Sequence, residues 1–125
     1  MIILLLVDDD EMALEMIRTR LTRLGYVVIT AIDAKEAIQA AREESPNLIL
    51  MDLCMPGVDG FEAAKQLKTD NETAHIPIVA ISALNTAVDV QRAIKAGCDS
   101  FQTKPVNVPS LHIKIRRLVW NAAGQ

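Results

Sequence analysis

Strand-like stretches alternate with helix-like segments five times along the 125 residues, and this alternation limits the possible folds more than any other feature of the sequence. The strand-like stretches are Ile2–Val7, Tyr26–Thr30, Leu48–Met51, Ile76–Ile81 and Asp99–Gln102. The helix-like segments are Glu11–Leu24, Asp33–Glu44, Gly60–Lys68, Thr86–Ala96 and Asn107–Asn121. Repeated strand–helix pairs with short connections favour an α/β protein, in which helices cover both faces of a parallel sheet.

Capping residues mark several expected helix ends. Asp33 and Glu36 have the spacing of a capping box, and Asn85 can cap the fourth helix. Gly25 and Gly97 stand where the first and fourth helices are expected to end.

The central stretch places an acidic residue at the end of a buried strand. The run Leu48–Met51 is apolar without polar alternation, which predicts a strand covered on both faces. Pro56-Gly57 and Asp59-Gly60 cannot continue that strand, so a turn is expected there. Asp52 is therefore expected at the carboxyl end of the strand, which is the edge where open α/β sheets bind ligands.

Composition narrows the function classes. A chain of 125 residues can form one domain with its own core, and none of its apolar runs is long enough for a membrane span. The apolar start, Met1–Val7, has no basic region before it and is interpreted as a strand, not a signal peptide. A net charge of −3 gives no electrostatic reason to bind nucleic acid or an anionic membrane. Cys54 and Cys98 fit no metal-binding spacing, and a cytoplasmic location is expected.

Polar side chains follow four of the five expected strands. They are Asp8-Asp9-Asp10, Asp52, Ser82 and Lys104. Each alone has an ordinary explanation, since a single Asp or Ser often caps a helix and a single Lys is usually solvated. Their joint placement at one edge of a parallel sheet favours a functional site instead.

These motifs resemble the receiver domain of two-component response regulators. The residues that carry the resemblance are Leu6-Val7-Asp8-Asp9, Met51–Gly60, Ile81-Ser82-Ala83 and Lys104-Pro105. The match extends from about Ile2 to Val119, so residues 1–125 are expected to form one receiver domain. The family implies a doubly wound, flavodoxin-like sheet of five parallel strands in the order 2-1-3-4-5.

That strand order allows the polar side chains to meet. Neighbouring strands lie about 4.8 Å apart, so Asp8 and Asp9 come within one spacing of Asp52. Lys104 must cross about two spacings, roughly 10 Å, which its long side chain can do. Two carboxylates about 5 Å apart repel by roughly 3 kcal/mol at an effective dielectric constant of about 20, so a cation is expected among them. Carboxylate oxygens without a Cys or His ligand set favour Mg²⁺ (Mn²⁺ is possible) over zinc.

The resemblance assigns the ligands of the metal ion. It implies that Asp9 and Asp52 bind the ion directly, that Asp8 binds it mainly through water, and that the backbone carbonyl of Cys54 completes the protein ligands. Asp10 falls outside the family pair and is interpreted as a helix cap.

The expected chemistry is phosphoryl acceptance by Asp52. A carboxylate is a nucleophile that can hold a phosphoryl group as an acyl phosphate. Lys104 and the Ser82 hydroxyl are expected to stabilise the phosphoryl oxygens. The family implies a donor phosphohistidine on a sensor histidine kinase or a histidine phosphotransfer protein. The domain is thus expected to be a phosphoacceptor that promotes its own phosphorylation and slow dephosphorylation, and not an enzyme acting on a separate substrate.

The family also implies a switch. Ser82 is expected to move toward the phosphoryl group while Phe101 turns inward, which changes the face formed by the fourth helix, fifth strand and fifth helix. A downstream protein is expected to read that face. The alternative for Phe101 is ordinary core packing. On the last helix, Ile113 and Trp120 are expected to project from the side opposite its core stripe, where they mark a partner surface or belong to a frayed end.

Two other function classes stay open. A Mg²⁺-dependent phosphohydrolase on a related sheet would usually need a second acid two residues after the nucleophile, where this chain has Cys54. A nucleotide or flavin module would need a Gly-rich phosphate loop, but the first turn here is rich in Asp. No output domain follows Gln125, so the chain is expected to act by docking or to be a piece of a larger protein.

Overall fold

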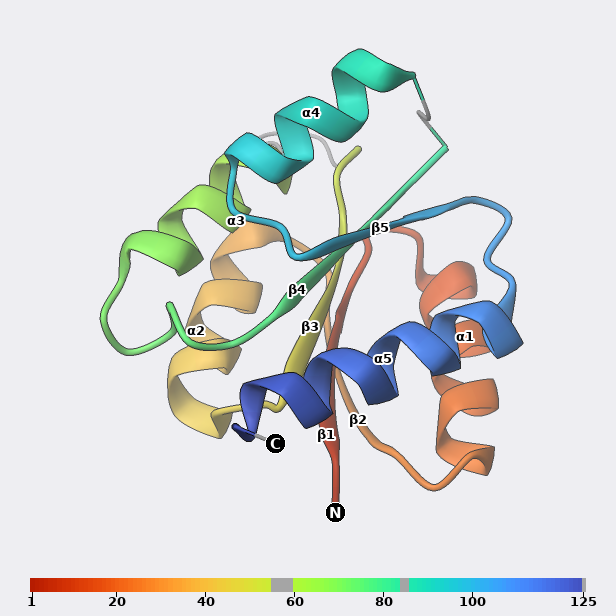
Figure 1. The fold of residues 1–125 in the computed structure, drawn as a ribbon. Helices are drawn as coiled ribbons and strands as arrows, with labels where there is room; N and C mark the ends of the chain where they lie inside the picture. The colour runs from red at the N-terminus through yellow and green to blue at the C-terminus, as the bar shows by residue number, and fades with distance from the viewer. Residues whose placement is uncertain (55–59, 84–85, 125) are drawn as a thin grey trace.

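A computed structural model describes residues 1–54, 60–83 and 86–124. Its five parallel strands are β1 (Ile3–Val7), β2 (Val27–Ala31), β3 (Leu48–Asp52), β4 (Ile78–Ser82) and β5 (Ser100–Thr103). Its helices are α1 (Glu11–Arg23), α2 (Ala34–Glu44), α3 (Gly60–Thr69), α4 (Ala87–Lys95) and α5 (Val108–Ala122). The strands form one sheet in the order β2-β1-β3-β4-β5, which confirms the predicted topology (Figure 1).

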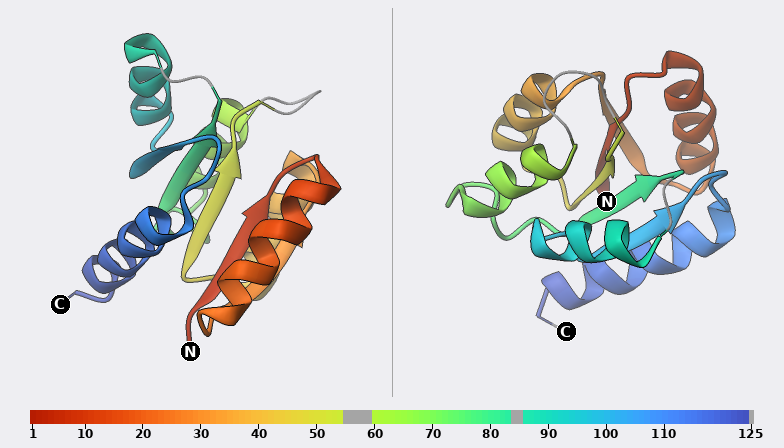
Figure 2. Two further views of the ribbon diagram at one scale, coloured as in Figure 1. Left: turned by 90° about the vertical axis from the view of Figure 1, so that its right-hand side faces the viewer. Right: turned by 90° about the horizontal axis from the view of Figure 1, so that it is seen from above.

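Helices cover both faces of the sheet, and alternate strand residues point into two separate cores. On one face, residues such as Leu5, Ile49 and Ile78 pack against α2, α3 and α4. On the other face, residues such as Leu50 and Val79 pack against α1 and α5. Seen from above in Figure 2, α1 and α5 lie on one side of the sheet and the other three helices on the opposite side. This double cover explains why the central strands have no polar alternation.

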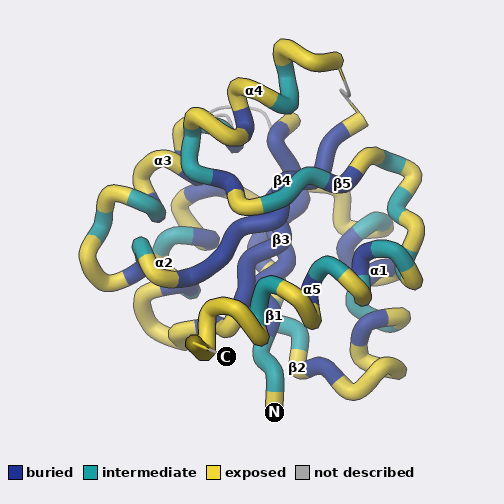
Figure 3. Tube along the Cα trace, in the orientation of Figure 1, coloured by how far each residue is buried: buried dark blue, intermediate teal, exposed yellow. Residues whose placement is uncertain are grey.

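Burial differs strongly between the central strands and α4. Every residue of β3 and β4 is buried, whereas α4 is largely exposed (Figure 3). Within the described part of the chain, no helix is long and apolar enough to cross a membrane.

Several helix ends differ from the sequence-based expectation. The cap of α4 is Thr86, whose side chain accepts a hydrogen bond from the Asp89 amide, so the helix begins one residue later than predicted. The expected cap, Asn85, lies outside the described residues. Asp33 caps α2 as predicted, but Glu36 accepts a hydrogen bond from the Ile32 amide instead of closing the box on Asp33.

Strand register brings the functional edge together. Val7 of β1 pairs with Met51 of β3, so the next residue on each strand, Asp8 and Asp52, stand opposite each other. Asp52 also pairs with Ile81 on its other side. The carboxyl ends of the central strands therefore deliver the acidic side chains to one place.

Candidate functional site

Three carboxylates meet at the carboxyl edge of the sheet. One oxygen from each of Asp8, Asp9 and Asp52 can be chosen so that all three lie within 4.8 Å of one another. Asp8 and Asp52 are each only 3% exposed, whereas Asp9 is open to solvent. Oxygen donors this close suit a hard divalent cation, and the set contains no thiol or imidazole.

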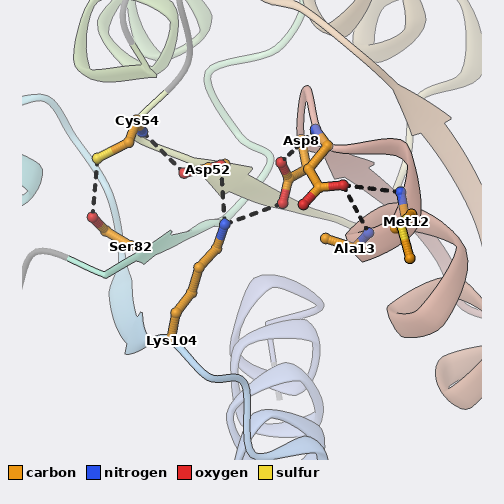
Figure 4. A network of polar contacts seen from close by, with 8 residues as sticks. Asp8, Met12, Ala13, Asp52, Cys54, Ser82 and Lys104 are labelled. Atoms are coloured by element: carbon orange, nitrogen blue, oxygen red, sulfur yellow. Dashed lines mark hydrogen bonds and ion pairs between the residues drawn. The ribbon is translucent and has the colours of Figure 1, made fainter.

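Lys104 reaches the acidic cluster from the far side of β4. Its Nζ lies 3.2 Å from Asp8 Oδ2 and 3.2 Å from Asp52 Oδ2, and it donates a hydrogen bond to each (Figure 4). The ammonium therefore bridges two buried carboxylates that come from different strands. The side chain does span the distance from β5 that the sequence argument required.

The surroundings of Asp52 and Lys104 raise the pKa values of both side chains. Burial raises the pKa of Asp52, and the charge of Asp8 raises it further, against the amide of Cys54 and the ammonium of Lys104. Burial alone would lower the pKa of Lys104, but the Asp52 and Asp8 carboxylates outweigh it and raise that pKa. Lys104 thus stays positively charged. The three carboxylates around it are not fully neutralised by this one ammonium.

Backbone contacts fix the Asp52 carboxylate. The amide of Cys54 donates to Asp52 Oδ1 at 2.9 Å, which leaves Oδ2 for Lys104. Gly60, at the start of α3, packs directly on this backbone: a Cβ there would lie 2.5 Å from the Asp52 carbonyl oxygen and 2.5 Å from Leu53 Cα. Only glycine fits such an approach without a backbone shift.

Ser82 lies on the other side of Asp52, at the end of β4. Its Oγ is 3.4 Å from the Sγ of Cys54, and its residue is 1% exposed. Ser82 was expected at this edge of the sheet, but nothing in the sequence indicated this thiol–hydroxyl contact. Whether the Cys54 carbonyl binds an ion stays a prediction.

Asp10 has the capping role that the sequence indicated. Its Oδ1 accepts hydrogen bonds from the amides of Met12 (3.0 Å) and Ala13 (3.4 Å) at the start of α1. Its own amide donates to Asp8 Oδ1 at 2.9 Å (Figure 4). The cap of α1 and the acidic cluster are therefore joined through Asp8.

The second expected switch residue, Phe101, lies on β5, and the residues expected to mark a partner surface lie on α5. Phe101 is half-buried and packs against the core beneath α4, which is also what ordinary core packing would give. Its carbonyl accepts a hydrogen bond from Lys114 Nζ on α5 at 2.8 Å. Ile113 and Trp120 are 59% and 62% exposed, as expected from the sequence.

Two further features are the turn expected after β3 and a contact between α5 and the residue before β2. The turn expected at Pro56-Gly57 and Asp59 lies outside the described residues. The contact between the Tyr26 hydroxyl and His112 Nδ1, 2.8 Å apart, could not be expected from the sequence, because the two residues are 86 positions apart.

Comparison with known proteins identifies the family. The family model of the response regulator receiver domain matches residues 4–116. The chain is 38% identical over 105 residues to the polar-differentiation response regulator DivK of Brucella anthropi, covering 84% of this chain and 85% of that protein. It is 38% identical over 115 residues to the response regulator PleD of Caulobacter vibrioides, covering 92% of this chain but only 25% of PleD.

Solved structures agree. A CheY-like receiver domain protein from Methanospirillum hungatei superposes with a TM-score of 0.91 at 25% identity, covering 99% of this chain and 98% of that one. The receiver domain of the Francisella response regulator 1452 gives a TM-score of 0.89 at 28% identity, covering 97% and 98%. The chain belongs to the response-regulator receiver family and is a receiver domain of two-component signalling, a phosphorylation-dependent switch.

The acidic cluster fits the metal binding that is general in this family. Receiver domains generally bind Mg²⁺ through acidic side chains, and the cluster of Asp8, Asp9 and Asp52 fits that ion by its oxygen donors and its excess negative charge. Response regulators interact with histidine kinases or phosphotransfer proteins and with downstream effectors.

Proposed function

We propose that Asp52 is the residue that accepts the phosphoryl group. An Asp52 carboxylate oxygen attacks phosphorus, the bond from phosphorus to the donor histidine nitrogen breaks, and that nitrogen keeps the electron pair. Later a water molecule attacks the phosphorus, the phosphorus–oxygen bond to Asp52 breaks, and inorganic phosphate leaves while the carboxylate is restored.

The observation that carries this proposal is the position of Lys104. Its ammonium lies 3.2 Å from Asp52 Oδ2, so a phosphoryl group formed on that carboxylate would have a positive charge within reach of its oxygens. Ser82, buried beside Cys54, supplies a hydroxyl that can donate to another oxygen. A Mg²⁺ ion held by Asp8, Asp9 and Asp52 would supply neutralisation of the charge on the transferring group.

The alternative, a phosphohydrolase, lacks its usual acid. The position two residues after Asp52 is Cys54, and its thiol contacts Ser82 instead of presenting a carboxyl group. We therefore propose a phosphoacceptor domain that promotes its own phosphorylation and slow dephosphorylation.

Partners follow from the same chemistry. A sensor histidine kinase or histidine phosphotransfer protein supplies the phosphoryl group, and a downstream protein reads the face of α4, β5 and α5 after Ser82 and Phe101 move. We also propose that residues 1–125 act as one receiver domain. The exposed Ile113 and Trp120 on α5 support a protein-binding role for this face.

The test is phosphorylation by acetyl phosphate with Mg²⁺, followed by intact-protein mass spectrometry. In this reaction the phosphorus–oxygen bond of acetyl phosphate breaks and acetate leaves. The wild-type chain is expected to gain one acid-labile phosphoryl group, and Asp52→Asn to gain none. Asp33→Asn is the matched control because Asn also serves as a helix cap there. Equal phosphorylation of Asp52→Asn and the wild type would refute the assignment.

A further inference from the structure

The helix α4 is held to the rest of the domain by few contacts. Among its nine residues, all of which the structure describes, Ala93 alone is buried. Val88 and Ile94 are 69% and 64% exposed. Figure 3 shows the helix as a largely exposed segment at the upper edge of the molecule. An element with so little buried surface can change position at a small cost in free energy.

A side-chain contact between Arg92 of α4 and Phe61 of α3 joins these two helices near the surface. The guanidinium carbon of Arg92 lies 4.0 Å from the centre of the Phe61 ring, which is a cation–π geometry. Around this contact the two helices leave an open hollow of about 310 Å³, lined in part by Lys65 and Lys95. The Arg92–Phe61 pair therefore bridges a gap that is otherwise incompletely packed.

The α3 end of this bridge is firmly fixed to the acceptor strand. Phe61 follows Gly60, whose amide donates to the Leu53 carbonyl at 3.3 Å and whose Cα packs against the Asp52–Leu53 backbone. Phe61 itself packs against the core on that face of the sheet. Four residues of α3 are buried, so this helix cannot follow a displacement of α4 easily.

The α4 end of the bridge is tied to the part of the site that the proposed function sets in motion. Thr86, the cap of α4, follows Ser82 by four positions. In the proposed switch, Ser82 moves toward the phosphoryl group and α4 shifts, whereas Phe61 stays with α3. The contact between Arg92 and Phe61 therefore opposes that movement.

We propose that the Arg92–Phe61 contact holds α4 in its resting position and is lost when Asp52 is phosphorylated, so that it sets how readily the domain switches. This proposal rests on the proposed function of Asp52. A cation–π contact at an exposed site corresponds to a shift of about 2- to 5-fold in an equilibrium between two states. Removing the contact shifts that equilibrium toward the phosphorylated conformation.

The first experiment measures binding of beryllium fluoride, a phosphoryl analogue, in the presence of Mg²⁺ by calorimetry. Arg92→Gln and Phe61→Leu are each expected to bind it about 2- to 5-fold more tightly than the wild type, and the double variant no more tightly than either. Lys95→Gln removes the same charge from the same helix and should leave the affinity unchanged. Unchanged or weaker binding by Arg92→Gln, or an equal gain in Lys95→Gln, would overturn the proposal.

The second experiment needs no phosphorylation. Amide hydrogen exchange in the untreated chain should be faster across α4 in Arg92→Gln and Phe61→Leu than in the wild type and Lys95→Gln. Equal exchange in all four proteins would show that the contact does not hold the helix. A wild-type chain that binds no beryllium fluoride would refute the proposed function and the switching part of this proposal, while the exchange comparison would still decide whether the contact restrains α4.

Discussion

Replacing Lys104 by methionine should destabilise the domain in a way that depends on pH and on Mg²⁺. The Lys104 ammonium lies 3.2 Å from a carboxylate oxygen of Asp8 and of Asp52, and both acids are buried. Methionine keeps most of the length and apolar bulk of the side chain but removes the charge. Two buried carboxylates then face each other without a protein cation between them.

The size of the effect follows from these distances. At an effective dielectric constant of about 20, each ion pair is worth about 5 kcal/mol in gross attraction, and the two carboxylates repel each other by about 3.5 kcal/mol. Desolvation of the three charges offsets much of the attraction, and removing one partner of a buried pair typically costs about 3–5 kcal/mol. Because the lysine side chain is 30% exposed, we expect a cost at the lower end of this range. The predicted loss in free energy of unfolding is about 3 kcal/mol at pH 7 without Mg²⁺.

The sign of the pH dependence is fixed by the pKa of Asp52. Burial and the charge of Asp8 raise this pKa above its value in the unfolded chain, and loss of Lys104 removes an influence that lowers it. The destabilisation is therefore fully present above the folded-state pKa and decreases as the pH falls through it, because a proton then neutralises the carboxyl group.

Urea unfolding in EDTA, at pH 7 and at pH 5, measures both effects, and repeating it with Mg²⁺ tests relief by a cation. We expect the deficit of Lys104→Met to shrink at pH 5 and in Mg²⁺. Lys35→Met, at an exposed position of α2, is the control and should change little. A Lys104→Met protein as stable as the wild type at pH 7 in EDTA would refute the electrostatic account of the site.

Three further predictions concern single residues. Gly60→Ala would bring a Cβ within 2.5 Å of the Asp52 carbonyl oxygen. We therefore expect urea unfolding to show a loss of about 1–3 kcal/mol in the free energy of unfolding, and we expect phosphorylation by acetyl phosphate to slow. Wild-type values for both would contradict the tight approach. Iodoacetamide at pH 8 should label the exposed Cys54 and spare Cys98, because burial raises the pKa of Cys98 to about 11. Equal labelling of the two cysteines in mass spectrometry would count against the burial of Cys98. Asp33→Ala should lower the free energy of unfolding by about 1 kcal/mol and Asp33→Asn by much less, and equal losses would exclude a capping role.

The positions of the strands and the burial of the central one could be predicted because they follow from local patterns. The unbroken apolar run before Asp52 predicted a strand covered on both faces, and the resemblance supplied the strand order. Because parallel strands end at one edge, the meeting of Asp8, Asp52 and Lys104 followed from order and reach alone.

Three finer features could not be predicted from the sequence, each for its own physical reason. The position of Thr86 next to Asn85 offered two possible caps, and local sequence does not decide between them. The contact of Arg92 with Phe61 depends on how two helices pack, which sequence spacing does not give. The need for glycine at position 60 arises from the backbone of β3, so the residue looked like an ordinary turn glycine.

The central claim, that Asp52 carries the phosphoryl group, is tested most directly by chemical trapping. Borohydride reduces an acyl phosphate to an alcohol, so a phosphorylated aspartate becomes homoserine, and peptide mass spectrometry locates it. After treatment with acetyl phosphate and Mg²⁺, homoserine is expected at position 52 and nowhere among the neighbouring acids. Homoserine at position 8 or 9, or a phosphorylated chain with an unchanged Asp52, would contradict the account.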